Sequence, residues 1–140
     1  MKRLLIALLL VFISLPSLKA QERELRFNKD RRFKIVQFTD VHWVYGNEAS
    51  NEAGERMAEV LDAEKPDLVV LTGDLVFAKP AGKALQKVLE PILKRGLRFA
   101  VTWGNHDDEH DMARAELSHF IENMPGNLSS TTEGVSGVTN

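Results

Sequence analysis

Residues 97–107 read LRFAVTWGNHD, and residues 68–74 read LVVLTGD. In both stretches a short, largely apolar run ends abruptly at glycine, and polar or acidic side chains follow. A third run, FKIVQFT at residues 33–39, ends in the same way at Asp40. Short β-rich runs that are bounded by turn residues are typical of strands in a protein core. These three stretches decide the fold, because each predicts a strand that ends in chemically functional residues.

The segments between the runs have the periodicity of helices. In residues 51–64, Met57, Val60 and Leu61 fall at helical spacing, and Lys65-Pro66 ends the pattern. Residues 80–95 and 111–122 predict two further helices. Strands that alternate with helices favour a parallel sheet in an α/β fold.

The N-terminus differs in composition from the rest of the chain. Lys2 and Arg3 precede the apolar run of residues 4–15, Pro16 breaks the run, and Ala20 offers a small residue for cleavage. This pattern predicts a secretory signal peptide over residues 1–20, although an uncleaved N-terminal anchor is the alternative. We therefore expect export to the periplasm or the exterior of a bacterium, with no membrane attachment after cleavage. Residues 21–32 are a charged, exposed lead-in, and residues 33–140 form the domain.

Composition excludes several classes of protein. The 140 residues contain 18 basic and 20 acidic side chains, for a net charge of −2. The chain therefore lacks the excess of basic side chains that is typical of nucleic-acid-binding proteins. The absence of cysteine excludes disulfides, cysteine-ligated zinc and a thiol nucleophile. Any metal ion must therefore be held by histidine, carboxylate or amide groups. The composition carries no signal for an oligomeric state.

Polar side chains follow all three predicted strands. They are Asp40 and His42 after the first strand, Asp74 after the second, and Asn105 and His106 after the third. Because the carboxyl ends of parallel strands meet at one edge of a sheet, we expect these side chains to converge. Carboxylate, imidazole and amide groups together suit a divalent metal ion.

Each motif taken singly also fits a turn or a helix N-cap. The set of three is more specific, because its spacings are those of a strand–helix–strand crossover. Asp40 and Asp74 are 34 residues apart, and Asp74 and Asn105 are 31 apart. A shared site is therefore favoured over three independent turns.

With these motifs, the sequence resembles the calcineurin-like metallophosphoesterase family. The match rests on residues 40–42 (DVH), 73–74 (GD) and 104–107 (GNHD). The longer string TWGNHDDE at 102–109 is similar to exported bacterial members that are related to plant and fungal purple-acid-phosphatase-like proteins. The resemblance implies a two-sheet sandwich flanked by helices. We expect this chain to hold the N-terminal half of that α/β fold, with the domain incomplete at its C-terminal end.

The resemblance also implies a phosphoric-ester hydrolase that uses two divalent metal ions, which are Mn, Fe, Zn or Mg. In the implied site, Asp40 and His42 bind the first ion and Asp74 bridges both ions. Asn105 binds the second ion and helps to hold the phosphate group of the substrate.

The remaining implied roles concern the chemical step. A hydroxide activated by the two metal ions attacks phosphorus. His106 acts beside the leaving group as a general acid or transition-state stabiliser, and Asp107 orients His106.

Two departures from the family pattern leave an alternative function open. Phe77 stands where purple acid phosphatases have a tyrosine that binds ferric iron. No Gly-His-x-His segment follows His106, and we expect His110 and His119 to be surface residues. The alternative is therefore a non-catalytic exported α/β domain, or an inactive fragment that retains the metal-binding motifs. A nucleotide-binding βαβ module is disfavoured, because neither G-x-G-x-x-G nor a P-loop follows the first strand.

Overall fold

The structure is a computed structural model, and it describes residues 25–131, 134 and 136–138. The predicted signal peptide of residues 1–20 lies outside these described residues. Residues 25–32 are exposed and precede the sheet. None of the helices in the described part of the chain has the length and apolar character needed to cross a membrane.

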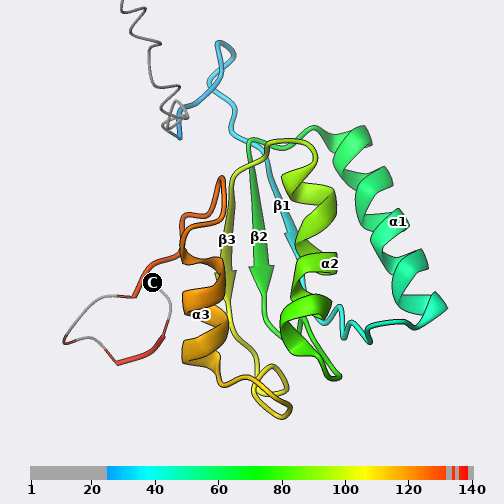
Figure 1. Cartoon of the computed structure of the whole chain (residues 1–140). Coiled ribbons are helices and arrows are strands. Elements are labelled where there is room, and N and C mark those ends of the chain that lie inside the picture. Colours follow the sequence, from blue (N-terminus) through cyan, green and yellow to red (C-terminus); the bar gives the residue numbers. More distant parts are fainter. Residues whose placement is uncertain (1–24, 132–133, 135, 139–140) are drawn as a thin grey trace, which may run out of the picture.

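Three parallel strands form the sheet, in the order β1-β2-β3. They are β1 (Ile35–Phe38), β2 (Leu68–Thr72) and β3 (Phe99–Thr102), and they run in the same direction in Figure 1. The strand β2 is central, and its Val69 is in register with Val36 of β1 and Phe99 of β3. The parallel α/β fold predicted from the alternating pattern is thus confirmed.

The helices are α1 (Glu48–Glu64), α2 (Ala81–Leu93) and α3 (Arg114–Glu122). The start of α1 lies before the predicted Asn51, because the side-chain oxygen of Asn47 accepts a hydrogen bond from the Ala49 N–H at 2.8 Å and caps the helix. The start of α3 lies after the predicted Asp111. The carboxylate of Asp111 instead accepts a hydrogen bond at 2.9 Å from the Ala81 N–H, at the beginning of α2.

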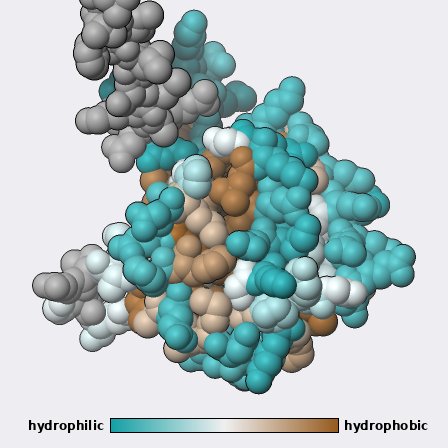
Figure 2. Space-filling model, viewed as in Figure 1, coloured by the Kyte–Doolittle hydropathy of each residue, from teal (hydrophilic) through white to brown (hydrophobic). Residues whose placement is uncertain are grey.

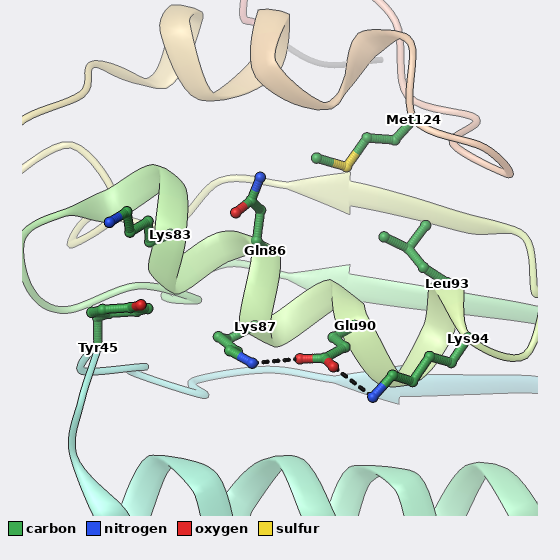
Figure 3. Close-up of a pocket in the computed structure, with 8 residues that line it drawn as sticks. All are labelled: Tyr45, Lys83, Gln86, Lys87, Glu90, Leu93, Lys94 and Met124. Atoms are coloured by element: carbon green, nitrogen blue, oxygen red, sulfur yellow. Dashed lines mark hydrogen bonds and ion pairs between the residues drawn. The ribbon is translucent and has the colours of Figure 1, made fainter.

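All three helices cover the same face of the sheet, as Figures 1 and 3 show. This face supplies the core, in which Val69, Leu71 and Phe99 are fully buried against Leu85 and Leu89 of α2. The opposite face carries no helix in the described part of the chain, and Ile35 there is 54% exposed. The one-sided arrangement follows from the strand order, because two successive right-handed crossovers place both connecting helices on one side.

Candidate metal centre

The loops that follow the three strands are joined by hydrogen bonds at one edge of the sheet. The N–H of Asp40 donates to the carbonyl oxygen of Gly73 at 3.1 Å, and the N–H of His42 donates to that of Asp74 at 2.9 Å. The N–H of His106 donates to Asp74 Oδ1 at 2.9 Å, which connects the third loop to the second. In Figure 1 these loops lie beyond the arrowheads of β1, β2 and β3. The carboxyl ends of the strands therefore form one continuous surface.

Three predicted site residues converge on that surface. One potential ligand atom from each of His42, Asp74 and His106 lies within 4.8 Å of the others. His42 Nε2 is 3.7 Å from Asp74 Oδ2, and all three side chains are half-buried. The imidazole of His42 and the carboxylate of Asp74 are donors that suit Zn, Mn or Fe, and the imidazole of His106 lies beside them. This cluster therefore fits a divalent metal ion.

Asp40 and Asn105 lie at the same edge but are exposed. Asp40 Oδ2 accepts a hydrogen bond from Thr39 Oγ1 at 2.5 Å, and Asp40 is not a member of the three-residue cluster. The backbone oxygen of Asn105 accepts a hydrogen bond from Arg114 Nη2 at 3.4 Å. The metal-binding roles of Asp40 and Asn105 stay predictions.

The backbone is strained at three of the four predicted metal ligands. Asp40, His42 and Asp74 have φ angles of 54°, 48° and 52°. Residues other than glycine seldom adopt this left-handed conformation, and each instance costs about 1 kcal/mol or more. Such outliers cluster where a structure must aim side chains at a functional site. Here they fall in the loops after β1 and β2.

Two glycines allow the second and third loops to touch. Gly73 has a φ angle of 92°, and a Cβ atom there would lie 2.6 Å from the backbone nitrogen of Gly104. A Cβ atom at Gly104 would lie 2.1 Å from Asp74 Oδ1. Any larger residue at Gly104 would therefore displace the carboxylate of Asp74 or separate the loops.

Asp107 is fully buried, and its carboxylate faces backbone amides. Oδ1 accepts from the N–H groups of Leu75 and Val76 at 2.7 and 3.1 Å. Oδ2 accepts from those of Asp74 and Gly104 at 2.9 and 2.7 Å. This corrects the geometry expected of Asp107, because these contacts hold the Asp74 and Gly104 loops together and do not orient the His106 ring.

The carboxylate that lies beside the His106 ring is that of Glu109. Its Oε2 is 2.8 Å from His106 Nδ1, and this contact raises the pKa of the imidazole above its ordinary value. The Phe77 and His42 rings pack edge-on against His106, with centroids 5.4 and 5.6 Å away. Glu109 was missed in the sequence, where the His-x-x-Glu spacing of residues 106–109 was its only signal.

His110 is not the surface residue that we expected. It is half-buried, its Nε2 atom is buried without a hydrogen-bond partner, and its ring centroid lies 5.8 Å from that of Phe77. Phe77 is 43% exposed and packs between His42, His106 and His110, which shields His110 from solvent. His119 is at the surface as predicted, with 83% of its side chain exposed.

A separate hollow of about 500 Å³ lies over α2, away from the metal-site cluster. Figure 3 shows Tyr45 and Lys83 at one end of it, and Leu93 and Met124 at the other. The apolar strip in Figure 2 lies between α2 and the region of α3. In the middle of the hollow, Glu90 is paired with Lys87 of the same helix and with Lys94, which directly follows that helix. None of the strand-end residues lines this hollow.

Comparisons with known proteins agree with this geometry. The sequence profile of the calcineurin-like phosphoesterase family matches residues 33–136. "Probable inactive purple acid phosphatase 14" of Arabidopsis thaliana is 31% identical over 125 residues, which are 76% of this chain and 31% of that protein. "Phosphatase DCR2" of Saccharomyces cerevisiae is 31% identical over 134 residues, which are 84% of this chain and 23% of that protein. This chain thus spans less than a third of the length of either relative.

Proposed function

Because this chain belongs to the calcineurin-like phosphoesterase family, we propose that it hydrolyses phosphoric esters with divalent metal ions held at the ends of its strands. The convergence of His42, Asp74 and His106 within 4.8 Å is the observation that carries the proposal. The three residues come from the loops after β1, β2 and β3, so only the folded sheet creates the cluster. The proposed ions are two of Mn, Fe, Zn or Mg.

Each residue of the site has a proposed role that follows from its position. His42 and Asp74 hold a metal ion, and Asp40 and Asn105 complete the site at its exposed rim. Divalent cations bound there would act as Lewis acids that polarise the phosphoryl oxygens and lower the pKa of a water molecule. Hydrolysis adds the oxygen of water to phosphorus and breaks the bond to the ester oxygen. His106 gives a proton to that departing oxygen, so the products are an alcohol and a phosphate.

A second candidate function is metal or phosphate binding without catalysis. It is favoured by the name of the relative described as inactive, which is 31% identical to this chain. The positions of Asp40 and Asn105 also fit this candidate, because one is the implied ligand of the first ion and the other of the second, and both are exposed and outside the three-residue cluster.

The test is hydrolysis of p-nitrophenyl phosphate and of its bis-ester with added Mn²⁺, together with the metal content of the protein. We expect turnover in the unaltered chain and a loss of about 100-fold or more in Asp74→Asn, because that change removes a ligand carboxylate. The control is Asp62→Asn, the same substitution at an exposed position of α1. Bound metal without turnover would support the second candidate, and absence of both would refute the metal site.

We also propose that the protein is exported. The pattern of residues 1–20 supports this location. Expression of the full chain in bacteria, followed by N-terminal sequencing of the periplasmic fraction, tests it. A mature N-terminus near residue 21 is the expected result, and an intact N-terminus in the cytoplasm would contradict it.

A further inference from the structure

The outward face of α2 is positively charged along the hollow that lies over it. Lys87 and Lys94 are both paired with Glu90. Lys83 forms no ion pair in the described part of the chain, and its Nζ lies 5.6 Å from the centre of the Tyr45 ring. Three lysines and one glutamate line the hollow, so positive charge is in excess there.

The neighbouring helix α1 has the opposite charge. Six acidic side chains lie on it, with Arg56 as its one basic side chain. The acidic residues of its C-terminal half already form ion pairs, and they are Glu59, Asp62 and Glu64. Those of its N-terminal half are exposed and form no ion pair within the described residues, and they are Glu48, Glu52 and Glu55. The unpaired acidic charge therefore gathers at the start of α1.

The helices α1 and α2 run side by side in the same direction, as Figure 1 shows. Asp62 and Arg95 each lie 14 residues after the first residue of α1 and of α2, and their side chains form two hydrogen bonds of 2.7 and 2.6 Å. This pair indicates that the two helices begin at the same level. With a rise of about 1.5 Å per residue, Glu52 of α1 and Lys83 of α2 then differ by about 3 Å along the helix direction.

These positions allow the two helices of one copy to match those of a second copy. A two-fold axis that runs parallel to the helices, over the groove between them, places α1 of each copy over α2 of the other. Such a rotation keeps the level of every residue, so the unpaired acidic residues of α1 face Lys83 and Lys87. Val60 is 39% exposed and Leu93 lies at the apolar end of the hollow, and each is 12 residues after the first residue of its helix. The rotation therefore also brings Val60 to the level of Leu93.

We propose that the hollow over α2 is a self-association surface, in which a second copy of this chain lays its α1 against α2 and receives the same contact in return. The second copy is the occupant that the charges favour, because its own α1 carries unpaired carboxylates at matching levels. The candidate metal centre lies at the ends of the strands and contributes no residue to the hollow. The test of this inference is therefore independent of the proposed function.

The size of this surface predicts a weak dimer. The 13 residues of α2 span about 20 Å, and two adjacent helices are about 20 Å wide, so each copy contributes about 400 Å² in projection. A standard stable interface buries about 800 Å² on each partner. We therefore expect a dimer that dissociates at low micromolar concentration. Because its contacts are mainly ionic, salt should weaken it.

The first experiment is sedimentation equilibrium of the full chain from about 10 μM to about 1 mM, at about 25 mM and about 500 mM NaCl. We expect dimers at the highest concentrations in low salt, and a dissociation constant that is about 10-fold higher or more in high salt. A monomer at every concentration in low salt would overturn the inference. A dimer that is indifferent to salt would overturn it as well.

The second experiment exchanges the charges of the two helices. Lys83→Glu and Glu52→Lys each place like charges opposite one another at both contacts of the dimer, so each should weaken its own dimer about 10-fold or more. A mixture of the two variants restores opposite charges at both contacts. We therefore expect a heterodimer whose affinity approaches that of the unaltered chain. The control is Lys29→Glu, the same reversal at an exposed position before the sheet.

The mixture also guards against loss of folding, because a heterodimer forms only if both variants are folded. Two variants that stay monomeric when mixed would overturn the inference. So would a loss in Lys29→Glu as large as that in Lys83→Glu, which would indicate a general effect of net charge. Variants that self-associate as strongly as the unaltered chain would place the contact on a different surface and would equally exclude this one.

Discussion

At the scale of single residues, Asp107 connects the fold to the candidate metal centre. Its buried carboxylate accepts hydrogen bonds from four backbone N–H groups on two loops. One of these loops carries Asp74 and the other carries His106. A buried charge is stable only when it is fully hydrogen-bonded, and removing its acceptors leaves the N–H groups without partners. Asp107 therefore fixes the distance between two residues of the cluster.

Asp107→Asn should lower the free energy of unfolding by about 3 kcal/mol, because hydrogen bonds to a charged acceptor are lost and an amide NH₂ faces backbone donors. Urea unfolding at neutral pH measures the change. The control is Asp108→Asn at the exposed neighbouring position, where the carboxylate pairs with Arg114 at 3.0 Å. That pair should contribute less than about 1 kcal/mol. Equal losses in the two variants would contradict the structural role of Asp107.

At the scale of elements, α2 carries a glutamate whose ion pairs with two lysines depend on pH. Lys87 Nζ lies 2.8 Å from Glu90 Oε2, and Lys94 pairs with the other oxygen of Glu90. Hydrogen bonds from these two lysines lower the pKa of Glu90 from the ordinary value of 4.5 to about 2. A lowered carboxyl pKa stabilises the folded state above the unfolded pKa, and this contribution is lost as the pH falls toward the folded pKa.

Glu90→Gln should therefore destabilise the protein at pH 7, with the difference fading as the pH falls from 4.5 toward 2. We expect the free energy of unfolding to fall by less than about 1 kcal/mol at pH 7, because the three side chains are 36% to 70% exposed and solvent screens their charges. Urea unfolding of both proteins across this pH range measures the effect, and added salt should reduce it. A difference that is as large at pH 2 as at pH 7 would exclude the ion pairs as its cause.

At the scale of the whole molecule, the candidate metal centre joins loops from all three strands. Unfolding must separate His42, Asp74 and His106, so a bound metal ion should stabilise the entire domain. At a Mn²⁺ concentration 100 times the dissociation constant, the gain should be about 2.7 kcal/mol. Thermal unfolding with and without Mn²⁺ measures it, and a chelator should reverse it.

The matched variants make this prediction specific. Asp74→Asn should lose most of the Mn²⁺-dependent gain, whereas Asp62→Asn on α1 should retain it. An equal gain in both variants would mean that Mn²⁺ stabilises the protein through a different site.

The sequence alone predicted the three strands and the metal-site edge, because hydrophobic periodicity and strand-end residues are local signals. Helix ends were less predictable. Asn47 extends α1 by capping it, and Asp111 delays α3 because it bonds to Ala81 at the start of α2. The first is a local cap that the periodicity of apolar residues does not reveal. The second is a contact between residues that are 30 positions apart.

The strand-end motifs are enough to predict which chemical groups gather at the ends of the strands, because a parallel sheet brings those ends to one edge. Which of these groups are in contact depends on how the loops pack against one another. Asp107 and Glu109 are both carboxylates close to His106 in sequence, and spacing alone does not distinguish their directions. The turn at residues 106–109 and the approach of the Gly73 loop bury one and return the other to the imidazole. Side-chain direction depends on backbone geometry and on distant partners, which composition and periodicity do not encode.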